Sequence, residues 1–180
     1  GLPFHFQHGL GSQLEQPQGL LAELKGVQLI SLDCPGHGQA PLPASTAPSF
    51  RFYAEQVLQL MDHLEIEKAI FGGISMGAGI STYIALHHPD RVRALVLVRP
   101  AWLDQGGPEN LQILVTAAEH MGQERGLVQF QSLPAFQAIQ TAVPNAAQSV
   151  LGVFASSQRP EIPTVLKAMV ADRPFEKIEA

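Results

Sequence analysis

The stretch Gly73-Ile74-Ser75-Met76-Gly77 decides how this chain is interpreted. It follows a short apolar run, Ala69-Ile70-Phe71, and precedes a segment with helical character, Ala78 to Leu86. A serine between a strand and a helix predicts a sharp turn that strains the serine backbone and lifts its hydroxyl clear of the sheet. We expect both glycines to be required, because a side chain two residues before or after Ser75 would collide as strand and helix approach each other. The pattern predicts a nucleophilic serine; the alternative is a glycine-rich turn with an incidental serine.

The composition of the 180 residues is that of a globular protein. Hydrophobic residues make up 46% of the chain and charged residues 15%, and the formal net charge is −5. This balance argues against disorder. We expect neither nucleic acid nor a membrane as a partner, because no basic cluster is present and the apolar runs are too short to span a bilayer. Cys34 is the only cysteine, so no disulfide can form within the chain, which is compatible with the cytoplasmic location that we expect.

Strands and helices alternate over the first hundred residues. Apolar runs predict four strands, at 2–7, 27–32, 68–72 and 92–98. Helical spacing predicts helices at 14–25, at 50–64 after a capping Ser49, and after Ser75. The alternation predicts an α/β fold, with a mostly parallel sheet, right-handed crossovers and flanking helices. The second strand is nearly all apolar, so we expect it to be buried on both faces.

The pattern changes after Arg99. Residues 108–171 have helical character throughout, and prolines interrupt them often enough to predict about four short helices. One interpretation is ordinary helical packing on the sheet, and the one that we favour is a helical cap over Ser75. The chain then divides into residues 1–101, the N-terminal part of a core, 102–172, the cap, and 173–180, the lead-in to the rest of the core. Trp102, at the start of the cap, is expected either to face a substrate or to pack under the cap.

Three motifs, in this order along the chain, resemble those of the α/β-hydrolase family. His8-Gly9-Leu10-Gly11 is similar to the family's first glycine turn. The loop 33–40 is similar to its D-x-x-G-H-G-x-S loop, with Ala40 where serine is usual, and the stretch 73–77 is similar to its nucleophile elbow. The resemblance extends over essentially the entire chain, and it implies the α/β-hydrolase fold.

The resemblance also implies a chemistry. Ser75 would attack a carbonyl carbon and form an acyl-enzyme. The backbone N–H groups of Leu10 and Met76 would form an oxyanion hole, and their side chains would line an acyl pocket that suits an apolar small molecule, an ester or a lactone. No metal and no organic cofactor is implied. Asp33 and His37 are expected to hold their loop by hydrogen bonds.

Two other functions remain open from the sequence. Relatives with the same fold cleave carbon–carbon bonds next to a ketone or make peracids, so a carbon–carbon bond hydrolase or perhydrolase is one alternative. The other belongs to a different class, a non-catalytic module that uses the pocket to bind a small molecule. Cys34 is expected to be a small, buried packing residue in each case. The oligomeric state does not follow from the sequence.

The remaining catalytic groups do not stand out in this sequence. The family's order is serine, acid, histidine, and Asp104 is the one candidate acid. The histidines after Ser75 are His87, His88 and His120, and none of them follows a late strand. Four predicted strands are half of the family's eight, and the strand at 92–98 would be an unprotected apolar edge. We therefore expect a fragment that is inactive by itself; the alternative is a naturally short, non-catalytic protein.

Overall fold

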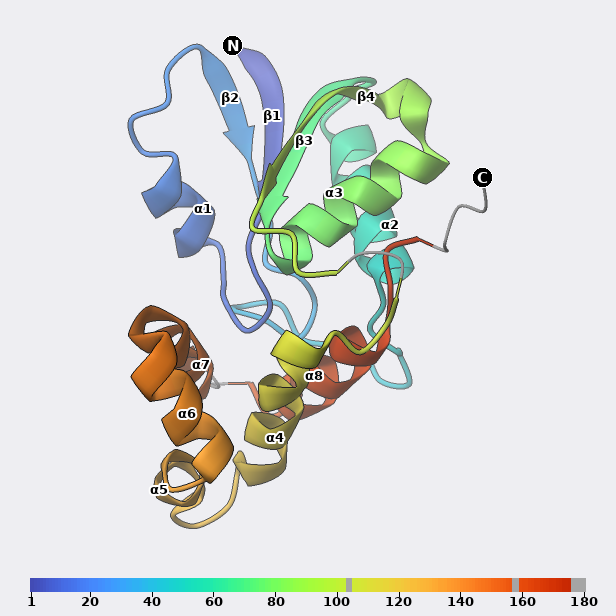
Figure 1. Ribbon diagram of the computed structural model, residues 1–180. Coiled ribbons are helices and arrows are strands. Elements are labelled where there is room, and N and C mark those ends of the chain that lie inside the picture. Colours follow the sequence, from blue (N-terminus) through green and yellow to red (C-terminus); the bar gives the residue numbers. More distant parts are fainter. Residues whose placement is uncertain (103–104, 157–158, 176–180) are drawn as a thin grey trace.

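The computed structural model describes residues 1–102, 105–156 and 159–175 (Figure 1). In this part of the chain four strands form one sheet in the order β2-β1-β3-β4, and every neighbouring pair is parallel. The strands are β1 (Leu2–Gln7), β2 (Val27–Ile30), β3 (Ala69–Ile74) and β4 (Val92–Val98). The α/β class and the parallel sheet expected from the sequence are confirmed.

Helices cover the two faces of this sheet unequally. The long helices α2 (Phe50–His63) and α3 (Met76–His87) lie together on one face, and the short helix α1 (Glu15–Leu20) lies on the other (Figure 1). On the α2 and α3 face the sheet is sealed by a buried apolar cluster, which includes Phe71, Phe50, Tyr53, Met61, Ile80 and Ile84. A 3-10 turn, η1 (Pro89–Arg91), leads from α3 into β4.

Two predicted elements are shorter and less buried than expected. The helix predicted at 14–25 ends at Leu20, and its leucine stripe is not packed, because Leu20 and Leu24 are about half exposed. The strand predicted at 27–32 ends at Ile30, and the expectation that both of its faces are buried is wrong. Within the described sheet β2 is an edge strand, so Gln28 is exposed and Ile30 alone of its four residues is buried.

The strand β4 forms the other edge of the described sheet. It pairs with β3 from Ala69 to Ile74, and its outer side has no strand partner within the described residues. Three consecutive apolar side chains of β4 are each 40% exposed: Leu95, Val96 and Leu97. The sequence-based expectation of an exposed apolar edge is therefore confirmed.

A second group of helices follows the sheet. It consists of the 3-10 turn η2 (Glu109–Leu111) and five α-helices, where the sequence predicted about four: α4 (Gln112–His120), α5 (Gly126–Gln131), α6 (Pro134–Ala142), α7 (Pro144–Ser156) and α8 (Ile162–Ala171). We call this group the helical region. It lies beyond the carboxyl ends of the strands, with α4 packed on α8 and α6 on α7 (Figure 1).

The helical region is joined to the core by side chains at its C-terminal end that bond to backbone groups of the core. The Asp172 carboxylate accepts a hydrogen bond from the Phe50 N–H at 2.7 Å, at the first turn of α2. The Arg159 guanidinium donates to the carbonyl oxygens of Gly38, at 2.9 Å, and Gln39. Within the described ranges, no helix has the length and apolar character needed to cross a membrane.

Candidate active site

Ser75 stands at the junction of β3 and α3 with an unusual backbone. Its φ is 55° and its ψ is −110°, a combination that costs energy for a residue with a side chain. Its N–H donates to the Val98 carbonyl at 2.9 Å, which fixes the turn to the neighbouring strand. The side chain is partly exposed. The sharp strand-to-helix turn predicted from the sequence is therefore confirmed.

The two glycines of the turn have no space for a side chain. A Cβ on Gly73 would lie 2.3 Å from the backbone carbon of Gly77, so strand and helix touch here as expected. A Cβ on Gly77 would lie 2.2 Å from the carbonyl oxygen of Gln7. The collision at Gly77 is thus with the neighbouring strand β1, and not with the strand that precedes the serine.

The turn that follows β1 lies beside Ser75. A Cβ on Gly9 would lie 3.7 Å from the Cβ of Ser75. Leu10 follows in this turn, and its N–H donates to no group in the described part of the chain. Met76 is the first residue of α3, so its N–H has no carbonyl one turn earlier in the helix. The structure thus brings the segments of all three predicted residues together.

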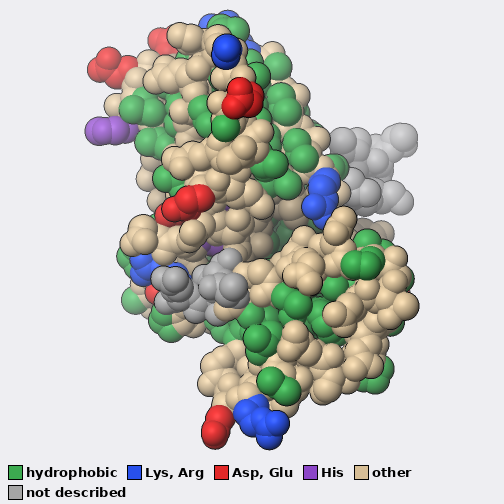
Figure 2. Space-filling model, turned by 90° about the vertical axis from the view of Figure 1, so that its left-hand side faces the viewer, with side chains coloured by type: hydrophobic (Ala, Val, Ile, Leu, Met, Phe, Trp, Pro, Cys, Tyr) green, Lys and Arg blue, Asp and Glu red, His purple; other side chains and the backbone are tan. Residues whose placement is uncertain are grey.

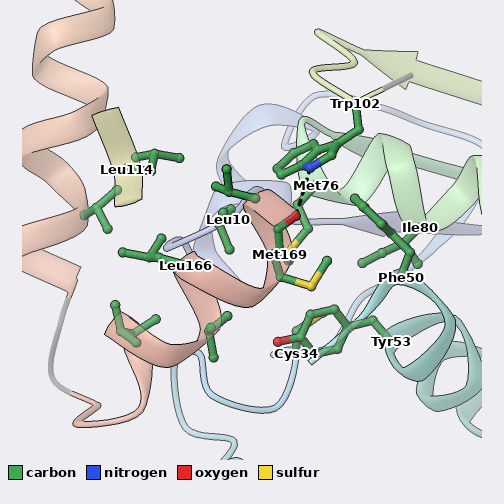
Figure 3. Close-up of a cluster of buried hydrophobic side chains, with 14 of the residues drawn as sticks. Leu10, Cys34, Phe50, Tyr53, Met76, Ile80, Trp102, Leu114, Leu166 and Met169 are labelled. Atoms are coloured by element: carbon green, nitrogen blue, oxygen red, sulfur yellow. Dashed lines mark hydrogen bonds between the residues drawn. The ribbon is translucent and has the colours of Figure 1, made fainter. Parts of the chain in front are cut away.

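The side chains of Leu10 and Met76 do not line an open pocket here. They are 9% and 0% exposed and belong to the buried cluster in which Leu166 and Met169 of α8 also lie (Figure 3). In the described part of the chain, both side chains are therefore packed within the apolar core that the sheet, its helices and the helical region share. Two cavities lie elsewhere, one at the amino ends of β3 and β4 and one within the helical region.

Trp102 was expected either to face a substrate or to pack under the helical region, and in the structure it is packed. The indole is 2% exposed, and its N–H donates to the Met169 carbonyl of α8 at 2.9 Å (Figure 3). Its ring meets the Phe50 ring edge to face, with centroids 5.3 Å apart. Trp102 thus joins α2 to α8 and offers little surface to a substrate. Asp104, the candidate acid, lies outside the described residues.

The loop 33–40 is held by Asp33 and by the backbone of His37. The Asp33 carboxylate accepts hydrogen bonds from the N–H groups of Leu14 and Gln39, both at 2.8 Å, as expected. The His37 N–H donates to the Cys34 carbonyl at 2.8 Å, and the His37 carbonyl accepts from the Ala40 N–H at 2.9 Å. Its ring packs between His8 and Tyr53, and burial lowers the pKa of His37 to about 3.

His8 is a structural residue that the sequence analysis did not assign. Its Nε2 accepts a hydrogen bond from the Cys34 N–H at 3.0 Å, so the proton is on Nδ1, which donates to the Gly9 carbonyl at 2.9 Å. Burial lowers the pKa of His8, which keeps the ring neutral. Both nitrogens are engaged, so His8 cannot take a proton from Ser75 in this arrangement. The position of His8 between a strand and a glycine turn was the sequence feature that could have indicated this structural role.

The later histidines lie away from the serine. His87 ends α3, which at twelve residues is about 17 Å long, and its ring stacks on Tyr83 near the surface. His120 ends α4, and its Nδ1 is 2.8 Å from the Thr116 carbonyl. No described residue is hydrogen-bonded to the Ser75 hydroxyl. In the same part of the chain, no group of three or more His, Cys, Asp or Glu residues could hold a metal ion.

Comparison with known proteins assigns the chain to a family. Residues 3–152 match the family description "alpha/beta hydrolase fold", and the chain belongs to that family. The resemblance seen in the three sequence motifs is thereby confirmed. A strained serine between a parallel strand and a helix is the elbow on which such folds present a nucleophile.

Particular relatives extend the comparison. The chain is 35% identical over 140 residues to the dihydrolipoyllysine-residue acetyltransferase component of the acetoin cleaving system of Pseudomonas putida, a match that covers 75% of this chain and 37% of that protein. It is 33% identical over 101 residues to 3-oxoadipate enol-lactonase 2 of Acinetobacter baylyi, covering 53% and 36% respectively. A solved structure of a thermophilic esterase from Thermogutta terrifontis matches 97% of this chain and 65% of its own, with 24% identity and a TM-score of 0.69. The last likeness shows the fold, and the chain spans less than two thirds of each of these proteins.

Proposed function

We propose that this protein is a serine hydrolase that acts on a small ester or lactone through an acyl-enzyme on Ser75. The observation that carries the proposal is the backbone of Ser75, at φ 55° and ψ −110° between β3 and α3. A serine buried in regular structure has no need of this strain, whereas a nucleophile aimed away from a sheet does. Membership of the α/β hydrolase family and the resemblance to an enol-lactonase support the reaction class.

The first chemical step follows from the groups around the serine. The Ser75 hydroxyl oxygen would attack the carbonyl carbon of the substrate, and the carbonyl electron pair would move onto the oxygen. The N–H groups of Met76 and Leu10 would bind this oxyanion, and the start of α3 adds the favourable end of the helix dipole. Loss of one such donor costs about a hundredfold or more in rate.

A general base must take the proton of Ser75. His8 is excluded as that base, because both of its nitrogens are hydrogen-bonded. As part of the proposal, we assign the base to a histidine, and its orienting acid to a carboxylate, in a part of the protein outside this chain. The activity is therefore proposed for the whole gene product and not for these 180 residues.

The helical region is proposed to act as the cap of the site. It lies at the carboxyl ends of the strands, and α8 covers the side chains of Leu10 and Met76 (Figure 3). The buried cluster to which Leu10, Met76, Leu166 and Met169 belong consists of hydrophobic side chains, and the outer face of the molecule is shown in Figure 2. A small apolar substrate suits such surroundings, because a charged one would lose hydration without gaining a partner.

The proposal is tested on the protein as its gene encodes it. We would measure hydrolysis of p-nitrophenyl acetate, and labelling by a p-nitrophenyl alkylphosphonate read by intact mass. In the labelling step the serine oxygen bonds to phosphorus and p-nitrophenolate leaves. We expect turnover and one adduct in the wild type, and neither in Ser75→Ala. The matched control is Ser81→Ala, which removes a buried hydroxyl without a partner on the same helix.

Two results would contradict the proposal. Turnover that persists in Ser75→Ala would assign the activity to another residue. A wild-type protein that neither turns over nor becomes labelled, but binds the ester analogue in calorimetry, would favour the non-catalytic binding module.

A further inference from the structure

The backbone of Gly9 has all of its hydrogen-bonding groups occupied. Its N–H donates to the side-chain oxygen Oε1 of Gln16 at 2.8 Å. Its carbonyl oxygen accepts from the Ser12 N–H at 3.1 Å and from His8 Nδ1 at 2.9 Å. A Cβ on Gly9 would approach both Gln16 Oε1 and the Ile74 carbonyl to 3.5 Å, so this glycine is enclosed between α1 and the serine turn.

These bonds leave one donor of the turn unengaged. The bond from Ser12 to Gly9 closes a four-residue turn in which Gly11 has a φ of 73°, as the third position of a type II turn requires. The Leu10 N–H takes no part in that bond. Without Gln16, the Gly9 N–H would be a second unsatisfied donor beside Ser75. The bonds of the Gly9 carbonyl to His8 and Ser12 would then be the ones left to orient the peptide that carries the Leu10 N–H.

The other supports of this turn come from separate elements. The Leu14 N–H, two residues before Gln16, donates to the Asp33 carboxylate, which anchors the start of α1. On the far side, a Cβ on Gly11 would lie 2.8 Å from Val153 of α7, so the helical region presses against the turn. Two side chains bond the backbone directly adjacent to Leu10: Gln16 accepts the Gly9 N–H, and the His8 ring donates to the Gly9 carbonyl.

We propose that Gln16 is a positioning residue of the oxyanion hole. By accepting the Gly9 N–H it orients the following peptide, so that the Leu10 N–H is the donor offered to the oxyanion. The inference rests on the proposed function, because it assigns a role in the reaction at Ser75. It goes beyond that function by assigning a residue of α1 that contacts neither the serine nor the substrate.

The variant Gln16→Met tests this role in the whole gene product. Methionine is similar in length and removes the acceptor oxygen, and Gln18→Ala is the control, since Gln18 is exposed on the same short helix. We expect Gln16→Met to lower kcat for p-nitrophenyl acetate about tenfold to a hundredfold, with KM nearly unchanged, because the lost interaction acts in the transition state. The rate of phosphonate labelling should fall in parallel, and Gln18→Ala should leave all three quantities at wild-type values.

Amide hydrogen exchange, measured by NMR, reports the geometry without catalysis. The Gly9 amide should be protected from exchange in the wild type. It should exchange rapidly in both Gln16→Ala and Gln16→Met. Unchanged protection of Gly9 in both variants would overturn the inference whatever the kinetics. Loss of protection without loss of kcat, or a rise in KM alone, would also overturn it. A wild-type protein with neither turnover nor labelling would refute the proposed function and this role together. If the Gly9 amide were still protected in that protein, Gln16 would only stabilise the turn.

Discussion

Two glycines beside Ser75 share one constraint, the absence of space for a methyl group. Gly73 meets the backbone of Gly77 and Gly77 meets the Gln7 carbonyl, whereas a Cβ on Gly9 would make ordinary contacts at 3.5–3.7 Å. The close approach of these backbones determines where the serine hydroxyl and the N–H groups of Leu10 and Met76 stand. At this scale, stability and chemistry depend on the same atoms.

Gly77→Ala provides the test of this close packing. The added Cβ would stand 2.2 Å from a backbone oxygen that cannot move without displacing β1. We expect the free energy of unfolding to fall by about 2–3 kcal/mol, the usual cost of forcing atoms into a filled site. Urea denaturation measures it. The control is Gly152→Ala in α7, where no described atom beyond the neighbouring helix backbone lies within 4 Å of the new Cβ. Alanine should stabilise the helix there by about 0.5–1 kcal/mol. Equal effects of the two substitutions would contradict the steric account.

The sequence predicted the roles of some residues of the site and not of others. The serine and its two glycines are specified by a local pattern, strand then turn then helix, which the sequence displays directly. The bonds of Gln16 and His8 depend on a side chain reaching back to a loop, which no local pattern encodes. The packing of the His37 ring was not predicted for the same reason, since its neighbours His8 and Tyr53 lie on other elements.

At the scale of elements, α2 illustrates how a helix start is secured. The Ser49 hydroxyl accepts from the Phe52 N–H at 3.0 Å, which is the cap that the sequence predicted. A second acceptor, the Asp172 carboxylate, takes the Phe50 N–H and comes from the end of the helical region. Two of the helix's unpaired donors are therefore satisfied, one locally and one across the molecule.

Removal of the local cap should have a measurable cost. We expect Ser49→Ala to lower the free energy of unfolding by about 1 kcal/mol, the typical value for a lost N-cap hydroxyl. Thermal or urea denaturation would measure the loss. Ser149→Ala is the comparison, because this exposed hydroxyl bonds to Asn145 inside α7 and caps no helix end. Its effect should remain within about 0.5 kcal/mol. If Ser49→Ala also leaves the free energy of unfolding unchanged, the Asp172 carboxylate alone is enough to stabilise the start of α2.

The strands whose bounds were predicted best include one in the middle of the described sheet and one at its edge. The first and fourth strands were predicted with their observed bounds, 2–7 and 92–98. The second strand and the first helix were predicted too long, because their apolar residues were assumed to be covered. Leu20 and Leu24 are instead exposed at the rim of the described fold, and hydrophobicity alone does not reveal where a sheet ends.

Considered as a whole, the molecule encloses several histidines in its interior. His5, in the middle of β1, is fully buried and has no hydrogen-bond partner among the described residues, and burial lowers its pKa to about 3. His37 has a similarly lowered pKa, again mainly because it is buried. In the unfolded chain both rings would bind protons near pH 6.5. Acid therefore favours the unfolded state.

This linkage gives a pH dependence with a definite sign. The free energy of unfolding should decrease as the pH falls from about 6.5 towards 3, by at most about 1.4 kcal/mol per pH unit for each histidine. Above pH 7 these rings should contribute no slope. We expect His5→Leu to make the acid-side slope shallower in urea titrations at several pH values. A slope that His5→Leu does not alter would contradict the assignment.

The fit between the helical region and the loops around Ser75 bears on how such a protein can be re-engineered. A Cβ on Gly11 would touch Val153, and one on Gly36 would come within 2.6 Å of Val165, so two valines occupy the places where loop side chains would otherwise stand. An exchange of α7 and α8 with the equivalent helices of a relative would import new residues into both niches. A chimaera should therefore fold only if the transferred helices and the loop glycines that face them are chosen together. The helical region and the loops around Ser75 are, in this molecule, not independent modules.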